Sequence, residues 1–295
     1  MPLVSDLRIL TGSRGGKSVT DKSIRFYVAG IHSKQPWFVL NAAKDYSLFT
    51  SQDPAISHFY SFESGAMAAD TLAIPDGCVD ILFDCCDTNP SAKVCGTTMT
   101  AVKANLSHGH RYFGVRFVPG MIPEFLQASA TELVGHEINL LEAAPQIAPV
   151  FEQIIGQQDF RQQVAAFNDF YHGRGLRMTS DLTRSAVSAI CQHKGNIQIQ
   201  ELEELTGYTS RTLQRNFQSD MGMSPKTFSR IIRCQSAVYD INQSKDVAFS
   251  DLACDLGFSD QSHFLREFKK LVSATPLDYL QRVHQESYLS RIRYC

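Results

Sequence analysis

Two stretches of the sequence place guanidinium, amide and amino groups on one side of an amphipathic helix. At 100° per residue, residues 207–225 and 257–276 each form an apolar face, which contains Phe217 in the first stretch and Phe268 in the second. The opposite faces carry Arg211, Arg215 and Gln218, and then Ser262, Arg266 and Lys269, with Gln214 and His263 at their flanks. Guanidinium and amide groups can pair with the edges of guanine and adenine in the major groove of DNA.

The two stretches are copies of one unit. Their Gly-aromatic turns begin 50 residues apart, and Phe217 and Phe268 lie 51 residues apart because the second copy contains one extra residue. A shorter amphipathic segment precedes each turn. The sequence therefore predicts two helix-turn-helix units, at about 197–219 and 247–271.

A single amphipathic segment, residues 225–243, connects the units. As one helix of 19 residues it would span about 29 Å at 1.5 Å per residue. Successive major grooves on one face of B-DNA lie about 34 Å apart. A rigid connection of this length could therefore hold both polar faces in adjacent grooves.

Residues 181–283 resemble the DNA-binding region of the AraC/XylS family of bacterial transcription regulators. The resemblance depends on the duplicated unit, on Arg233 and Ala237, and on the motif "GFSDQSHFLREFKK" followed by Thr-Pro and Tyr279. In that family the second helix of each unit reads the major groove. Carried over by position, the resemblance implies these base-reading residues: Arg211, Gln214 and Arg215, then Gln261, Ser262, His263 and Arg266.

The chain departs from the family pattern at three positions. Glu203 stands where a small alanine is usual, Ser273 replaces the glycine before the final Thr-Pro, and Leu280 follows Tyr279 where arginine is common. The resemblance implies a homeodomain-like all-α region over 181–295 that binds double-stranded promoter DNA. It also implies RNA polymerase as a partner if the protein activates transcription.

Residues 1–172 have a different pattern. Short aromatic and β-branched runs separated by Gly, Pro, Asp and Ser predict strands up to about residue 120, and helical periodicity follows. Residues 173–180 are the predicted linker. Regulators of this family often pair the DNA module with a cupin-like barrel, and "IPDGCVDILFD" and "GVRFVPG" resemble the N-terminal region of one subgroup. The predicted class is therefore α+β in two domains.

Polar residues inside the apolar strands are candidates for binding a small-molecule effector. They are Asp80, Tyr112 and Arg116, and each could orient a ligand in a barrel. Each could also face solvent from the other side of its strand. In the alternative hypothesis the N-terminal domain binds no small ligand and serves only for dimerisation or protein interaction. The helical stretch 151–172 is the predicted homodimer surface, with packing on its own domain as the alternative.

The segment "TGSRGGKS" at 11–18 resembles a phosphate-binding loop, but Thr11 stands where its first glycine is required. A strand-like run follows it, where such a loop needs a helix, so a flexible loop is favoured. We find no Ser-His-Asp order and no motif of paired acids. The sequence therefore predicts no catalytic residue, no cofactor and no enzymatic activity.

His108 and His110 alternate along a strand as metal ligands can, but no glutamate follows at close range. A polar turn is favoured, and no metal is predicted. Cys85 and Cys86 are flanked by Asp84 and Asp87, whose charges should raise the thiol pKa values, and this disfavours a redox switch.

Composition limits the remaining classes. No apolar run reaches 18 residues and the N-terminus has no signal-peptide pattern, so a cytoplasmic protein without a membrane partner is expected. The eight cysteines show no disulfide framework. The net charge is −2, so binding to a polyanion requires local clustering of basic residues. The first helices of the units carry five acids, which are Glu201, Glu203, Glu204, Asp251 and Asp255.

Overall fold

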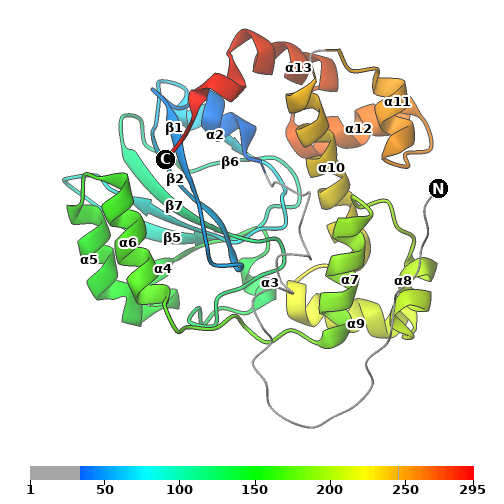
Figure 1. The fold of residues 1–295 in the computed structure, drawn as a ribbon, viewed down its shortest axis with the longest axis horizontal. Helices are drawn as coiled ribbons and strands as arrows, with labels where there is room; N and C mark the ends of the chain where they lie inside the picture. Colours follow the sequence, from blue (N-terminus) through cyan, green and yellow to red (C-terminus); the bar gives the residue numbers. More distant parts are fainter. Residues whose placement is uncertain (1–33, 245) are drawn as a thin grey trace.

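The structure, a computed structural model, describes residues 34–244 and 246–295 and divides them into a β-rich half and a helical half (Figure 1). This division confirms the predicted α+β class, with an N-terminal sheet and C-terminal helices. The segment 11–18, considered above as a phosphate-binding loop, lies outside the described residues. None of the described helices is long and apolar enough to cross a lipid bilayer.

The larger sheet has the strand order β8-β5-β4-β7-β2-β1-β9. Its strands are β1 (Tyr46–Thr50), β2 (Ile56–Glu63), β4 (Asp80–Asp84), β5 (Ser91–Cys95), β7 (Arg111–Phe117), β8 (Glu137–Asn139) and β9 (Ile292–Tyr294). A second sheet pairs β3 (Leu72–Ala73) with β6 (Val102–Lys103). Within the described residues β8 and β9 are the two edges of the larger sheet and do not pair. The cupin-like barrel therefore stays a prediction.

The two faces of the larger sheet have different neighbours because side chains alternate along each strand. In β7, Phe113 and Phe117 point toward α5 (Ala148–Gly156) and α6 (Phe160–Tyr171), and these three elements contribute to one apolar core. Arg116 belongs to the other face, where β3, β6 and the helical half lie. Figure 1 shows α5 and α6 on one side of the sheet and the C-terminal helices on the other.

Helices α5 and α6 use their apolar faces inside the chain. Phe151, Ile154, Val164 and Phe167 are each 5% exposed or less and pack in the core against the sheet. The apolar surface that motivated a dimer through 151–172 is therefore covered by the chain's own sheet. Dimerisation itself stays a prediction.

The helical half contains the two predicted units and the connection between them. Its helices are α7 (Asp181–Gln192), α8 (Ile199–Thr206), α9 (Ser210–Met221), α10 (Pro225–Gln243), α11 (Phe249–Asp255), α12 (Gln261–Val272) and α13 (Pro276–Gln285). Helices α8 and α9 form the first unit, and α11 and α12 form the second. The connecting helix α10 has the bounds expected from the sequence. Four of these helices, α9, α10, α12 and α13, begin at an N-cap residue whose side-chain oxygen accepts a backbone N–H of the first turn. The N-cap residues are Thr209, Ser224, Asp260 and Thr275.

The two halves are joined by more than the linker. The Trp37 indole N–H donates to the Val272 carbonyl over 3.0 Å, and β9 extends the sheet by pairing parallel to β1. In the predicted linker, the Gly175 carbonyl accepts a hydrogen bond from the Glu124 N–H at 3.0 Å. The linker thus runs along the N-terminal half, and the last strand of the chain belongs to its sheet.

Candidate nucleic-acid interface

Helix α9 buries its apolar face and exposes its polar face. Leu213 and Phe217 are 1% and 0% exposed and lie in the core formed with α7, α8 and α10. The predicted reading residues of this helix are all exposed: Arg211, Gln214, Arg215 and Gln218. Because the core residues fix the rotation of the helix, the polar side chains point outward without taking part in folding.

Helix α12 repeats this arrangement. Phe264 and Phe268 are 0% and 2% exposed. On the opposite side the predicted residues Ser262, Arg266 and Lys269 are exposed, and Gln261 is exposed as the first residue of the helix. His263 is half-buried, and its ring packs edge-on against Phe258 with centroids 5.3 Å apart. Eight of the nine predicted residues are therefore exposed, and His263 lies at the margin of the second outward face.

The carboxylates nearest these faces are engaged by other groups. Asp260 caps α12 by accepting the His263 backbone N–H over 2.7 Å, and this hydrogen bond lowers the pKa of Asp260. Glu267, at the edge of the second face, accepts a hydrogen bond from the Arg230 Nε at 2.7 Å. The unusual Glu203 accepts the backbone N–H of Ser210 at the start of α9. Sequence reasoning did not identify Arg230, because it lies 37 residues from Glu267.

Arg233 fixes both units to the connecting helix. Its guanidinium donates to the Gly195 carbonyl at 2.9 Å and to the Gly257 carbonyl at 3.3 Å, and it stacks over the Phe258 ring. A Cβ atom at Gly257 would lie 2.0 Å from the Asn196 side chain, so glycine allows the two units to touch. Contacts around this arginine therefore add to the apolar packing of α10 against both reading helices.

A family model described as a helix-turn-helix domain matches residues 202–282, which run from α8 to α13. Residues 202–282 form a helix-turn-helix domain. The resemblance to AraC-type regulators predicted from the sequence is confirmed for this domain. A second model, described as a domain of unknown function, matches residues 53–139 of the sheet half.

The matches to known proteins cover between 35% and 82% of this chain. The chain is 28% identical over 102 residues to an uncharacterized HTH-type transcriptional regulator of Haemophilus influenzae, and the match covers 35% of this chain and 34% of that relative. A probable AraC family transcriptional regulator from Rhodopseudomonas palustris is 29% identical, with a TM-score of 0.31, over 35% of this chain and 97% of that one. ToxT from Vibrio cholerae O395 is 15% identical, with a TM-score of 0.38, over 82% of this chain and 94% of that one. This chain thus spans about a third of the length of the curated relative.

In the sheet half, the structure brings together two of the three predicted effector residues. The Arg116 guanidinium contacts the Asp80 carboxylate at 2.9 Å and the Asp76 carboxylate at 3.2 Å, and the Tyr60 hydroxyl donates to Asp80 at 3.1 Å. Burial raises the pKa of Asp80 against the opposing effect of Arg116. These residues line a cavity of about 290 Å³. Tyr112 does not line it; its hydroxyl accepts the Ser107 N–H.

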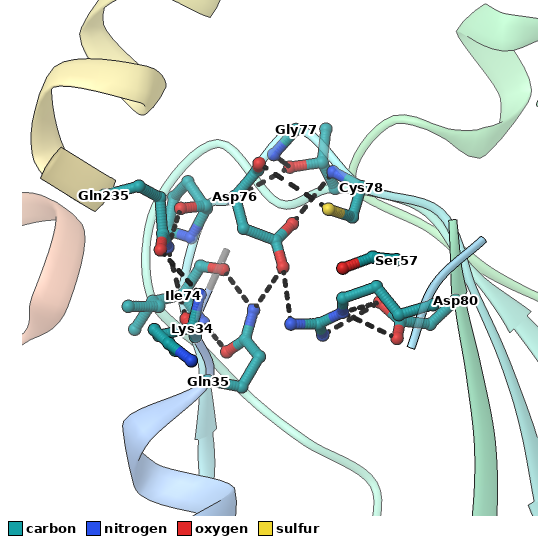
Figure 2. A network of polar contacts seen from close by, with 12 residues as sticks. Lys34, Gln35, Ser57, Ile74, Asp76, Gly77, Cys78, Asp80 and Gln235 are labelled. Atoms are coloured by element: carbon teal, nitrogen blue, oxygen red, sulfur yellow. Dashed lines mark hydrogen bonds and ion pairs between the residues drawn. The ribbon is translucent and has the colours of Figure 1, made fainter. Parts of the chain in front are cut away.

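A polar network leads from this ion pair to α10 (Figure 2). The Gln35 amide donates to the Asp76 carboxylate at 2.9 Å and to the Ile74 carbonyl at 2.7 Å. The Gln235 amide of α10 donates to the Pro75 carbonyl at 2.9 Å and accepts the Lys34 N–H at 2.8 Å. The loop that carries Asp76 is therefore bound directly to the helix that spaces the two units.

The histidine pair and the adjacent cysteines have separate partners. The Nδ1 of His108 lies 2.8 Å from the Gly65 carbonyl, whereas that of His110 lies 2.9 Å from Asp84, which raises the pKa of His110. In the described part of the chain, no three His, Cys, Asp or Glu side chains are grouped to hold a metal ion.

The expectation that Asp84 and Asp87 raise both thiol pKa values is wrong for Cys86. A hydrogen bond with the Thr88 hydroxyl lowers the pKa of Cys86, whereas burial raises the pKa of Cys85. The two adjacent thiols therefore differ in environment, one in the core and one beside a surface hydroxyl.

Proposed function

We propose that the protein is a sequence-specific DNA-binding transcription regulator. The observation that carries this proposal is the pair of exposed, cationic and amide-bearing faces on α9 and α12, held on one connecting helix. Arginine and glutamine are the side chains that pair bidentately with guanine and adenine. The partner is double-stranded promoter DNA, with RNA polymerase as a further partner if the protein activates. We propose no enzymatic activity, and we place the protein in the cytoplasm with its target DNA.

The experiment is a footprint of the full chain on its own upstream DNA at about 0.15 M salt, the physiological range. Two protected segments about one helical turn apart are expected, because each reading helix occupies one major groove. Equal affinity for the upstream DNA and for a random duplex would contradict sequence-specific binding. One protected segment in place of two would contradict a role for both units.

A small molecule bound in the cavity near Asp80 and Arg116 controls this activity in our proposal. The cavity combines apolar walls with a few convergent polar groups, as small-ligand sites do. Its ion pair is connected through Asp76 to the loop that Gln235 binds, so ligand contacts there can bias the position of α10. Tyr112 lies outside the cavity wall, so it does not contact the ligand in this proposal.

A thermal-shift screen of metabolites, followed by DNA titrations, tests this control. A ligand of the cavity should raise the melting temperature and change DNA affinity, and Gln235→Ala should reduce the second effect while leaving the first. A ligand that changes DNA affinity equally in both proteins would show that Gln235 carries no coupling. Light scattering of the full chain tests the proposed homodimer separately.

A further inference from the structure

A groove of about 600 Å³ lies between the two helix-turn-helix units. The N-terminal end of α8 forms one wall, the flank of α12 forms the other, and α10 forms the floor. Lys226, Ser229, Arg230 and Arg233 line the floor and share one face of α10, because they are spaced three and four residues apart. None of these four was among the predicted DNA-binding residues.

The groove carries a positive charge. Three cationic side chains line it against a single carboxylate, Glu267, which is already paired with Arg230. Lys226 is exposed, and within the part of the chain that the structure describes it forms no ion pair. The first turn of α8 adds the positive end of a helix dipole at Ile199 and Gln200, and the Glu201 carboxylate already accepts the Gln198 N–H there at 2.6 Å. The cationic side chains of α10 are therefore the main positive charge of the groove. The groove therefore favours an anion.

Ser229 provides an independent sign of a missing partner. Its residue is 5% exposed, and among the described residues its hydroxyl has no hydrogen-bond partner. A buried polar group without a partner destabilises a protein, so such groups are rare unless something else binds them. Ser229 lines the groove, but its hydroxyl oxygen is itself buried, so an oxygen acceptor that enters there reaches it only after a small side-chain adjustment.

We propose that this groove binds phosphates of the DNA backbone between the two half-sites. In helix-turn-helix proteins the first helix of a unit crosses the DNA backbone while the second occupies the major groove. Helix α8 is the first helix of one unit and α12 is the reading helix of the other. The backbone that runs between the two major grooves therefore passes the groove, where Lys226, Ser229 and the α8 N-terminus meet it. This inference rests on the proposed DNA binding.

The test compares Lys226→Ala and Ser229→Ala in titrations of the full chain with its upstream DNA and with a random duplex. Lys226→Ala should weaken both by a similar factor and reduce the slope of log affinity against log salt by about 0.9, the value for one phosphate contact. Ser229→Ala should weaken both by about tenfold to about a hundredfold, the effect of one hydrogen bond to a charged group. If Ser229 has only a structural role, the DNA affinity of Ser229→Ala should be unchanged.

Matched controls distinguish the loss of a DNA contact from a change in folding and from a change in net charge. Ser236→Ala removes another buried hydroxyl of α10, one that already bonds the Ile232 carbonyl at 3.0 Å, and should leave DNA affinity unchanged. Lys44→Ala removes one positive charge of the sheet half, which lies 3.9 Å from the Glu63 carboxylate, and should leave the salt slope unchanged. Circular dichroism should show all four variants folded.

The outcomes distinguish the inference from the proposed function. If the unchanged chain binds DNA while Lys226→Ala and Ser229→Ala keep its affinity and salt slope, the phosphate groove alone is wrong. Inorganic phosphate could raise the melting temperature of the unchanged chain but not of Lys226→Ala, while both proteins bind DNA with the same affinity. In that case the groove binds a small anion and the inference is overturned. Absence of any DNA binding by the unchanged chain would overturn both proposals.

Discussion

Ser273 and Gly222 end the two reading helices in the same left-handed backbone conformation, with φ values of 64° and 69°. In each case the backbone N–H donates to the carbonyl four residues earlier, on Lys269 and Gln218, at 2.9 and 3.0 Å. Glycine adopts this conformation freely, whereas residues with a Cβ atom lose about 1–2 kcal/mol in it. The second unit therefore carries a strain that the first does not.

Ser273→Gly should raise the free energy of unfolding by about 1 kcal/mol, because it removes this strain at an exposed site. Urea denaturation measures the change. Ser219→Gly is the matched control: the same substitution inside α9 should lower stability by about 0.5 kcal/mol, the difference in helix propensity. A loss of stability in both variants would show that the Ser273 side chain makes a compensating interaction.

Arg266→Ala and Arg215→Ala should each weaken specific DNA binding by about 1–3 kcal/mol and relax the preference at one base pair, because each arginine is exposed opposite a buried core. Affinities for a set of point-substituted duplexes measure both effects. The two relaxed positions should lie about one helical turn apart.

Phe268→Ala is the folding control for these arginines. Its ring is 2% exposed, so its removal should cost about 3–5 kcal/mol of stability. Full promoter affinity and an unchanged footprint in both folded arginine variants would contradict the assignment of α9 and α12 as reading helices. An equal loss on every duplex would instead assign the arginine to a phosphate.

Arg116→Leu should destabilise the chain by about 3–5 kcal/mol, because Asp80 and Asp76 would keep buried carboxylates without their cation. The double variant Asp80→Asn/Arg116→Leu should recover part of this loss. Denaturant unfolding of the single and double variants measures the coupling. Equal losses in both would show that Asp80 does not depend on Arg116.

The pair of His110 and Asp84 predicts a pH-dependent contribution to stability. Because Asp84 raises the pKa of His110 in the folded state, the contribution is complete below the unfolded histidine pKa of about 6.5. It is lost as the pH rises through the raised folded pKa. His110→Gln should therefore lower stability more at about pH 5.5 than at about pH 8.5, by less than about 1 kcal/mol for this partly exposed pair. A larger loss at the higher pH would contradict the sign.

Local periodicity was sufficient to predict the helical half. Each copy of the unit has a Gly-aromatic turn followed by apolar residues on one helical face, and this pattern predicts α9 and α12. An unbroken amphipathic pattern from Pro225 predicts α10. The outward position of Arg215 and Arg266 follows from the same pattern, because a helix fixes the angle between a core residue and its neighbours.

Contacts between distant residues were beyond sequence reasoning. The pairing of Arg230 with Glu267 and the unpartnered hydroxyl of Ser229 depend on how α10 meets α12. The apolar face at Phe167 looked like surplus surface, since nothing local shows that a sheet covers it. Likewise, a short strand at residues 292–294 gives no signal of its distant partner β1.

The pairing of β9 with β1 has a consequence during synthesis. Ribosomes add about 5–20 residues per second, so β1 leaves the ribosome on the order of tens of seconds before the strand that borders it. During that interval one edge of the nascent sheet has unpaired backbone groups, which can recruit other chains. A premature stop just before Ile292 would leave both helix-turn-helix units in the translated product but make that transient open edge permanent.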